Sequence, residues 1–240
     1  MKWSHFFTSA VGRKFVMALT GIFLISFLAV HVGLNACIFN DLSFFDSSDN
    51  GSMFNRAAHF MGATIVIRIM EIGLFAGFIL HIIQGYMIEA KNRARRKQGY
   101  QVALGNRGSK WYSRSMAILG SLVLIYLVIH IAHFWVPSRI TGGMQEVQYN
   151  GSTVEVHNLY LLMFETFQSL PVVILYLAGV AALAFHLFHG FHSAWRSLGV
   201  HNKKYLALLR SFGYGFTIIV SILFALMPIA MYLQWVTPYE

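Results

Sequence analysis

The sequence predicts an all-α integral membrane protein, a bundle of five transmembrane helices with the N-terminus in the cytoplasm. Of its 240 residues, 57% are hydrophobic and only 11% are charged, and the mean hydropathy is +0.58. Soluble domains contain about 25% charged residues. The composition therefore excludes a soluble globular enzyme and a nucleic-acid-binding protein that relies on the net charge of +9. The single cysteine, Cys37, excludes an internal disulfide and Cys-rich metal sites.

Five apolar runs are long enough to cross a bilayer, which takes roughly 20 helical residues. Backbone polar groups inside lipid have no water to bind, so these runs are expected to be helices. We place them in one domain that covers residues 1–240, at about 15–39, 60–89, 115–137, 168–195 and 211–236.

The distribution of Lys and Arg predicts the orientation. Of the 18 cationic residues, 15 lie in the N-terminal segment and in the connections between spans 2 and 3 and between spans 4 and 5. These 15 are Lys2, Arg13, Lys14, Lys91, Arg93, Arg95, Arg96, Lys97, Arg107, Lys110, Arg114, Arg196, Lys203, Lys204 and Arg210. Because cytoplasmic loops carry an excess of cations, we expect these segments in the cytoplasm and the C-terminus outside. The same basic loops are compatible with attraction to anionic lipid and with docking of a soluble partner.

The outer connection, at about 138–167, contains a hairpin signal. Asn150 and Gly151 separate two alternating stretches at 145–149 and 152–156, which favours a two-residue turn between short strands. We expect a small hairpin on the outer face.

Seven histidines fall within the predicted spans, where an ionisable side chain is costly to bury and is a functional candidate. They are His31, His81, His130, His133, His186, His189 and His192. At 1.5 Å per residue, His31 and His130 lie roughly 10–12 Å below the outer surface. By the same count His81 and His186 lie roughly 12–14 Å below the inner surface. Four helices thus supply two histidine pairs at two depths.

Glycines recur around these pairs. Gly21 and Gly120 each precede a histidine, His31 or His130, by ten residues. Gly85 and Gly190 each follow a histidine of the inner pair by four residues, close to the same helix face. A glycine there removes a side chain that a flat macrocycle would strike.

Two neutral imidazoles that face each other from opposite helices form the axial ligand set of a b-type haem. The two depths therefore predict two haems, stacked across the membrane. For any single histidine the competing interpretation is an interhelical hydrogen bond in a satisfied core. Zinc fits less well, because no carboxylate or thiolate accompanies these histidines.

Other polar residues in the spans have open roles. Arg68 and Glu71 lie three residues apart and can share a helix face, so Arg68 either neutralises the propionates of the outer haem or pairs with Glu71. Glu71 is then a candidate for exchanging protons with an outer quinone. For His133, His189 and His192 the candidate roles are propionate binding, a quinone pocket or solvation of a helix end.

Taken in order, these segments resemble the di-haem, five-helix cytochrome b subunit of succinate:quinone oxidoreductases and fumarate reductases. The matching segments are GIFLI at 21–25 before His31 and Asn35, FNRAAHFM at 54–61, Arg68 and Glu71 before His81 and Gly85, Gly120 before His130, and Phe185 and His186 before Gly190. The resemblance covers roughly residues 10–236.

The resemblance implies the residue roles and the partners. The four haem ligands fall on His31 and His130 for the distal haem and on His81 and His186 for the proximal haem. His59 falls on a family histidine that is not a ligand. The family's flavoprotein and iron–sulfur subunits dock on the cytoplasmic face, and its five-helix, two-haem type works with menaquinone on the distal side. Our candidates for the quinone site are Arg68, Glu71 and His133.

The sequence thus favours a membrane anchor that carries electrons from an iron–sulfur subunit through two haems b to menaquinone, in the bacterial inner membrane. Dicarboxylate chemistry would lie in the partner subunits. Three alternatives remain: a quinol:fumarate reductase subunit working in the opposite direction, the cytochrome b subunit of another dehydrogenase, and a transporter whose histidines relay protons without haem.

Overall fold

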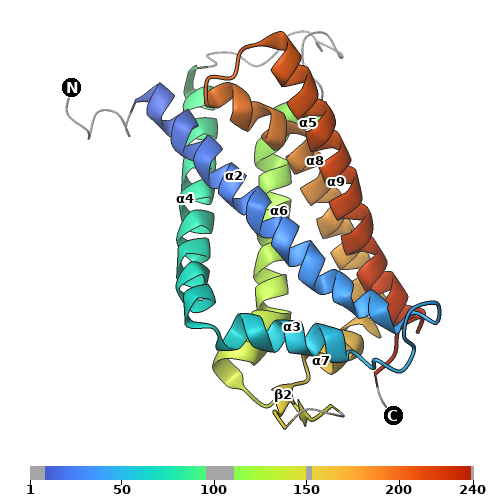
Figure 1. Ribbon diagram of the computed structural model, residues 1–240. Helices are drawn as coiled ribbons and strands as arrows, with labels where there is room; N and C mark the ends of the chain where they lie inside the picture. Colours follow the sequence, from blue (N-terminus) through green and yellow to red (C-terminus); the bar gives the residue numbers. More distant parts are fainter. Residues whose placement is uncertain (1–8, 96–110, 150–152, 239–240) are drawn as a thin grey trace. The chain divides into compact units, whose positions relative to one another are not determined.

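The computed structural model describes residues 9–95, 111–149 and 153–238. In this part the protein is an all-α bundle, and five of its helices are long and apolar enough to cross a membrane (Figure 1). The long helices are α2 (Ala10–Asn35), α4 (Ile65–Arg95), α6 (Met116–His130), α8 (Leu170–Ser197) and α9 (Lys203–Tyr232). The short elements are η1 (Ala36–Asp41), α3 (Ser52–Ala63), α5 (Trp111–Arg114), η2 (Ile131–Trp135), η3 (Pro137–Thr141), β1 (Glu146–Val147), β2 (Val156–His157) and α7 (Leu159–Phe167).

The five predicted spans are confirmed as helices, and several of their bounds differ from the predicted ones. The first span begins at Ala10 rather than near 15, and the second ends at Arg95 rather than near 89. The second span begins at Ile65 rather than near 60, because Thr64 is extended and separates it from α3. The fifth span begins at Lys203 rather than near 211. Its first turn is capped by Asn202, whose Oδ1 accepts hydrogen bonds from the backbone N–H groups of Lys204 (2.9 Å) and Tyr205 (3.4 Å). The charged first turn therefore belongs to the helix and not to a loop.

The helix α6 changes its hydrogen-bond pattern near Pro137. Proline has no backbone N–H, and its ring crowds the carbonyl four residues earlier, which here belongs to His133. The chain responds with two π-helical segments, η2 and η3, that carry the helical direction on to Thr141. Such π segments often occur at functional sites, and this one holds His133 and Trp135.

The residues group into two compact units, and each of the long helices α2, α4, α6, α8 and α9 contributes to both. Unit 1 comprises Met1–Phe27, Ile72–Leu122 and Ala182–Ile218. Unit 2 comprises Leu28–Glu71, Val123–Ala181 and Ile219–Glu240.

The surfaces of the long helices are apolar. Large aliphatic side chains stand exposed along them, among them Ile72 (72% exposed), Leu208 (66%) and Val128 (61%). Soluble monomers rarely expose apolar patches of this extent, whereas lipid tails accommodate them. The chain is a multi-pass membrane protein.

Unit 2 carries a cap built from short elements. Within it α3 lies across the direction of the long helices and contacts η1, β2 and α7 (Figure 1). The strands β1 and β2 pair antiparallel, with Glu146 opposite His157 and Val147 opposite Val156, as expected for a small hairpin. The expected turn at Asn150 and Gly151 lies outside the described residues.

A buried amide ties the cap together. Asn55 of α3 is fully buried. Its Nδ2 donates to Tyr149 Oη (2.7 Å) and Asn158 Oδ1 (2.9 Å), and its Oδ1 accepts from the backbone N–H of Tyr160 (2.9 Å). Both amide hydrogens and the oxygen are therefore satisfied, which a buried polar side chain requires.

Gly51 precedes α3 in a conformation that favours glycine. Its φ is +75°, and a Cβ there would overlap the ring of Tyr160. Its backbone N–H donates to both carboxylate oxygens of Asp41 (3.0 and 3.3 Å). The start of α3 thus depends on a residue without a side chain.

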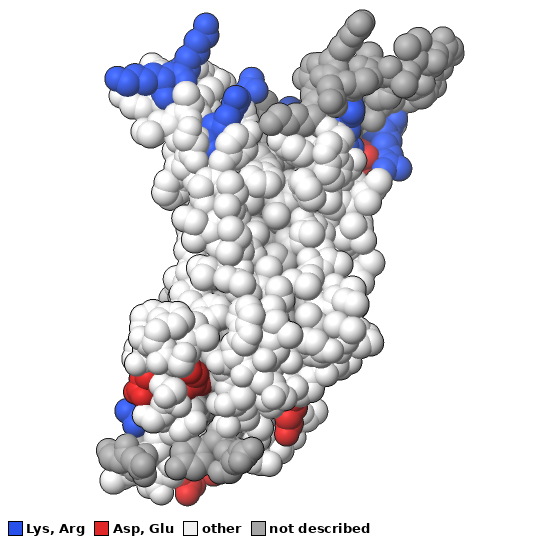
Figure 2. All heavy atoms as spheres, turned by 90° about the vertical axis from the view of Figure 1, so that its right-hand side faces the viewer, with Lys and Arg blue, Asp and Glu red and all other residues white. Residues whose placement is uncertain are grey.

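Acidic and basic residues are distributed unequally between the two units. Unit 1 has one acidic residue in its sequence, Glu89, against most of the chain's Lys and Arg. On the face drawn in Figure 2, the Lys and Arg side chains of unit 1 gather at its end, with an acidic side chain beside one group of them. In unit 2, by contrast, acidic residues outnumber Arg56, Arg68 and Arg139.

Candidate functional site

Two of the predicted ligand histidines face each other in unit 2. His31 on α2 and His130 on α6 have ring centroids 5.7 Å apart, with an angle of 88° between the ring planes. Aromatic side chains surround them: Phe224 lies 5.7 Å from His31, and Tyr126 and Phe134 lie 5.7 and 5.4 Å from His130. The sequence-based pairing of these two residues agrees with their positions.

The other two face each other in unit 1. His81 on α4 and His186 on α8 have ring centroids 6.2 Å apart, with an interplanar angle of 64°. Counting depth along four separate helices therefore paired the same residues that lie together in space.

Both separations suit two imidazoles on opposite sides of one metal ion. An imidazole nitrogen binds a metal at about 2 Å, so two such rings have centres about 6 Å apart. In the described part of the chain, no three His, Cys, Asp or Glu side chains are grouped where they could hold a metal ion together. A pair of ligands fits a haem, whose porphyrin supplies the four equatorial nitrogens, better than it fits zinc, which takes three or four protein ligands.

Glycines allow the rings of the unit 1 pair to lie close to neighbouring helices. A Cβ on Gly21 of α2 would lie 3.6 Å from His81 Cε1, and a Cβ on Gly120 of α6 would lie 3.5 Å from His186 Cε1. The space therefore holds a methyl group at most. The sequence showed the recurrence of these glycines, but not that each one lies against a histidine of the unit 1 pair.

The two glycines that follow the unit 1 histidines His81 and His186 differ from each other. A Cβ on Gly85 would lie 3.4 Å from Met17 Cε, so the space beside this glycine is occupied by the Met17 side chain. A Cβ on Gly190 would meet nothing within 4 Å. The expected clearance next to a ligand is thus compatible with Gly190, whereas Gly85 packs against α2.

The four histidines differ in whether their Nδ1 atoms have hydrogen-bond partners. Thr20 Oγ1 lies 3.2 Å from His81 Nδ1. Asn35 Nδ2 lies 2.8 Å from the His31 carbonyl oxygen and 3.4 Å from His31 Nδ1. The buried Nδ1 atoms of His130 and His186 have no hydrogen-bond partner among the described residues.

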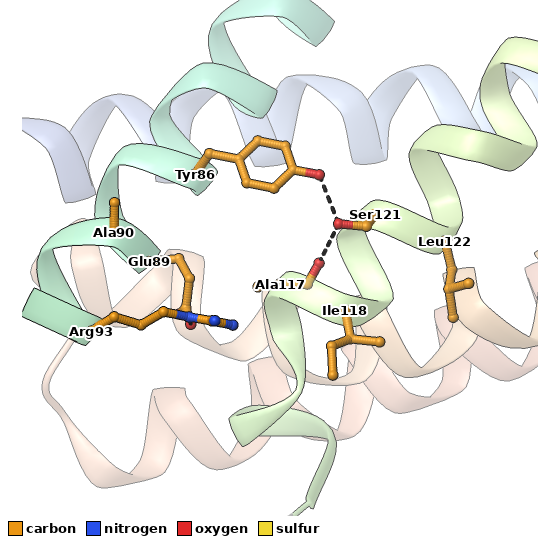
Figure 3. A pocket seen from close by; sticks show the side chains of 8 residues that line it. All are labelled: Tyr86, Glu89, Ala90, Arg93, Ala117, Ile118, Ser121 and Leu122. Carbon is orange, nitrogen blue, oxygen red and sulfur yellow. Dashed lines mark hydrogen bonds and ion pairs between the residues drawn. The ribbon is translucent and has the colours of Figure 1, made fainter. Parts of the chain in front are cut away.

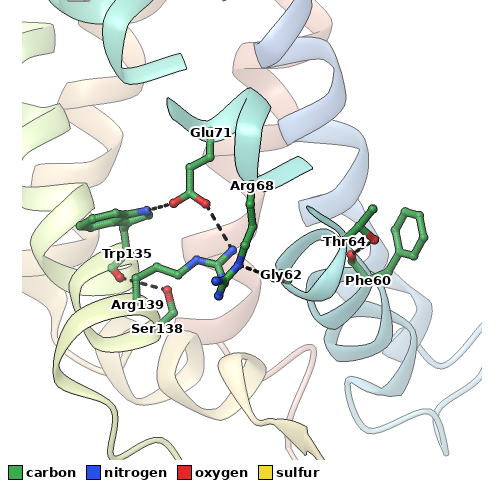
Figure 4. Close-up of polar contacts among 8 residues, drawn as sticks. All are labelled: Phe60, Gly62, Thr64, Arg68, Glu71, Trp135, Ser138 and Arg139. Atoms are coloured by element: carbon green, nitrogen blue, oxygen red, sulfur yellow. Dashed lines mark hydrogen bonds and ion pairs between the residues drawn. The ribbon is translucent and has the colours of Figure 1, made fainter. Parts of the chain in front are cut away.

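A polar cluster in unit 2 surrounds Glu71, near the start of α4 (Figure 4). The indole nitrogen of Trp135 donates to Glu71 Oε1, and the Arg139 guanidinium lies 3.6 Å from Glu71 Oε2. Arg68 does not pair with Glu71, although the two are three residues apart. Its Nε donates instead to the Gly62 carbonyl oxygen (3.1 Å). Glu71 therefore pairs with Arg139, which lies on the π-helical segment η3, and not with Arg68 on its own helix.

The remaining histidines take separate positions. His133 stacks on Tyr176 with 7° between the rings, and its Nδ1 lies 3.0 Å from the Tyr176 hydroxyl. His192 lies 3.1 Å from an Arg210 guanidinium nitrogen. His133 therefore belongs to the aromatic wall around His130. Nothing in these contacts gives His189 a role.

A separate cavity of about 530 Å³ opens between α4 and α6 in unit 1 (Figure 3). Tyr86 and Ser121 point toward one another across it and share a hydrogen bond of 2.7 Å. Glu89 and Arg93 form an ion pair of 2.6 Å at its rim. None of the sequence-predicted site residues lines this cavity.

Sequence analysis missed four residues that the structure brings into these sites: Thr20, Trp135, Arg139 and Tyr176. Pro137 is a signal that could have indicated an irregular turn beside Trp135 and Arg139. Comparison with protein-family models, with curated proteins and with solved structures finds no match for this chain.

Proposed function

We propose that this chain is the membrane-anchoring cytochrome b subunit of a succinate:quinone oxidoreductase, which passes electrons from an iron–sulfur subunit to menaquinone. The observation that carries the proposal is the facing of His31 with His130 and of His81 with His186, at 5.7 and 6.2 Å. The family resemblance supplies the identity of the complex.

His31 with His130 would hold one haem b, and His81 with His186 would hold the other. The bound group supplies one-electron transfer at an iron centre. The protein contributes the ligands, the low-polarity surroundings and the hydrogen bonds that tune the ligands. Tyr126, Phe134 and Phe224 exclude water from the outer pair, and Gly21 and Gly120 let the rings of the inner pair lie against α2 and α6.

The charge difference between the units supports the orientation. Cations in loops stay on the cytoplasmic side, so we assign unit 1 to that side and His81 with His186 to the proximal haem. The flavoprotein and iron–sulfur subunits then dock on the basic face of unit 1. Succinate oxidation takes place in these partners, and the membrane is the bacterial inner membrane.

The cluster around Glu71 supports an outer quinone site. Reduction of a quinone takes up two electrons and two protons, so a titratable group beside the quinone ring is required. Glu71 is such a group, and its side chain is 23% exposed, between Trp135 and Arg139. We assign proton exchange to Glu71, propionate neutralisation to Arg68, and a place in the wall of the site to His133.

A pyridine haemochrome assay with a dithionite-minus-oxidised spectrum tests the proposal on the purified full chain, expressed with its operon neighbours. Two b-type haems per chain are expected. One haem would mean that one histidine pair is misassigned. A folded preparation without haem would overturn the electron-transfer function in favour of a transporter in which the same histidines relay protons.

A further inference from the structure

Thr20 places a hydroxyl group against one of the four predicted ligands. It lies on α2, one residue before Gly21, and both it and His81 belong to unit 1. Its Oγ1 lies 2.9 Å from the Val16 carbonyl oxygen, 3.2 Å from the Met17 carbonyl oxygen and 3.2 Å from His81 Nδ1.

Counting hydrogens assigns the direction of the contact with His81. A hydroxyl group has one hydrogen to donate, and a carbonyl oxygen only accepts. Threonine in a helix commonly donates to the carbonyl oxygen four residues earlier, and Val16 offers the shortest distance of the three. The hydroxyl therefore presents a lone pair to His81, so the hydrogen of that contact is carried by Nδ1. In a neutral imidazole this leaves the lone pair on Nε2.

Gly21 and Thr20 act on the same edge of the ring. A Cβ on Gly21 would lie 3.6 Å from His81 Cε1 and 4.0 Å from Nδ1, so the glycine lets this edge approach α2 within reach of the hydroxyl. His186, which faces His81, also lies against a glycine of a neighbouring helix, but no hydroxyl group precedes that glycine. Gly120 of α6 lies against the same ring atoms of His186, and the residue before it is the buried Leu119. His186 Nδ1 accordingly has no hydrogen-bond partner in the part of the chain that is described.

We infer that Thr20 is a positioning residue that holds His81 as the Nδ1–H tautomer and leaves Nε2 free to bind a metal. A neutral imidazole binds a metal through its unprotonated nitrogen, and a hydrogen bond on the other nitrogen fixes both the tautomer and the ring orientation. Within this pair, a hydrogen bond fixes the tautomer and ring orientation of His81, whereas no such hydrogen bond among the described residues fixes those of His186. That the metal is a haem iron rests on the proposed function, whereas the tautomer is a property of the chain alone.

Nitrogen NMR of the haem-free full chain tests the tautomer directly. The chain is labelled with ¹⁵N-histidine and placed in lipid nanodiscs, and the His81 signals are assigned by their loss in His81→Gln. We expect a protonated Nδ1 and an unprotonated Nε2 in the wild type and in Thr20→Ser, which keeps the hydroxyl. Thr20→Val keeps the shape of the side chain but lacks the hydroxyl, so its His81 should be protonated on Nε2 or be a mixture of the two tautomers. A wild-type His81 protonated on Nε2, or a Thr20→Val spectrum equal to the wild type, would overturn the inference.

Haem titration supplies the second measurement. Thr20→Val should weaken binding at the His81 and His186 pair by about 10- to 100-fold, which is typical when the partner of a metal-binding histidine is lost. Thr20→Ser should restore it. Ser26→Ala is the matched control, because Ser26 also donates to a carbonyl oxygen on α2, that of Ile22 (3.0 Å), without touching a histidine in the contacts described.

The two proposals fail in different ways. If the wild type binds no haem, the proposed function fails and the NMR result on His81 stands by itself. If the wild type binds two haems and Thr20→Val binds both with unchanged affinity, the inference fails and the proposed function stands. Circular dichroism of each haem-free variant checks that the helices are intact.

Discussion

The carboxylate of Glu71 accepts a hydrogen bond from the indole nitrogen of Trp135, although 64 residues separate the two. Trp135 reaches Glu71 because the backbone after His130 is π-helical. The Arg139 guanidinium, 3.6 Å from the other carboxylate oxygen, completes the cluster. In the proposed function Glu71, whose side chain is 23% exposed between an indole donor and a guanidinium, is the group assigned to proton exchange with the quinone.

Glu71→Gln is therefore expected to separate proton transfer from haem binding. The amide oxygen still accepts from Trp135, but the side chain no longer takes up and releases a proton. We expect quinone reduction by the intact complex to fall by about 10²- to 10⁴-fold, the usual contribution of a general acid or base. The haem spectrum should be unchanged. Glu89→Gln is the control, because Glu89 pairs with Arg93 in unit 1. Unchanged quinone reduction in Glu71→Gln would contradict this role.

Replacement of His81 by alanine tests the pairing of ligands. His81 faces His186, and the outer pair uses neither residue. We expect haem content to fall from two per chain to one, with the absorption of the outer haem largely intact, measured by pyridine haemochrome and redox titration. His59→Ala is the control, since His59 is exposed on α3. Loss of both haems, or of neither, would count against the pairing.

A leucine at position 190 tests whether a flat group lies beside His186. Gly190 follows His186 by four residues on nearly the same face, and a Cβ there meets nothing within 4 Å. We therefore expect Gly190→Leu to leave the thermal stability of the haem-free protein unchanged and to lower the haem content to one. Gly73→Leu on α4 is the control, because Gly73 is exposed and a Cβ added there would also meet nothing within 4 Å. Two haems in Gly190→Leu would mean that the macrocycle lies elsewhere.

The sequence predicts the spans and the histidine pairs because both depend on quantities that composition and spacing determine. Apolar length sets the helices, and the rise of 1.5 Å per residue sets depth. Depth does not give the rotation of a helix about its axis. The contacts of Thr20 with His81 and of Trp135 with Glu71 depend on that rotation, and for this reason they were not predicted.

Arg68 illustrates the limit of local spacing. Residues three apart on a helix can pair, yet Arg68 donates to a carbonyl oxygen at the end of α3 and Glu71 pairs with Arg139. Two features decided the outcome. The break at Thr64 ends α3 just before α4, so the Gly62 carbonyl oxygen accepts from Arg68, and Pro137 opens the π-helical segment that holds Arg139. Both features lay outside the helical periodicity from which the pairing was derived.

The cap of unit 2 should depend on Asn55. Replacement by alanine leaves the backbone N–H of Tyr160 without its acceptor and removes two donated hydrogen bonds in a fully buried place. Each buried group left unsatisfied costs about 1–3 kcal/mol. We expect the free energy of unfolding in detergent to fall by at least that amount. Asn92→Ala, an exposed change on α4, should stay within about 0.5 kcal/mol of the wild type. Equal effects of the two changes would contradict the bridging role.

The same cap should weaken in alkali. Burial raises the pKa of Tyr149, whose hydroxyl accepts from Asn55 and donates to the Asn50 carbonyl oxygen (3.3 Å). A raised pKa means that folding favours the neutral phenol. Its contribution is therefore complete below the ordinary tyrosine pKa of about 10 and is lost as the pH rises above it, because the unfolded chain ionises first.

Tyr149→Phe isolates this contribution, because phenylalanine has no group to ionise. We expect the free energy of unfolding to fall less steeply between pH 9 and about pH 11 in Tyr149→Phe than in the wild type, although the variant starts from a lower value. The difference between the two slopes is the measurement. It removes the common effect of the other tyrosines, whose titration both proteins share. Parallel slopes would mean that Tyr149 ionises as readily in the folded chain as in the unfolded one, and that its hydroxyl does not bridge α3 to the hairpin.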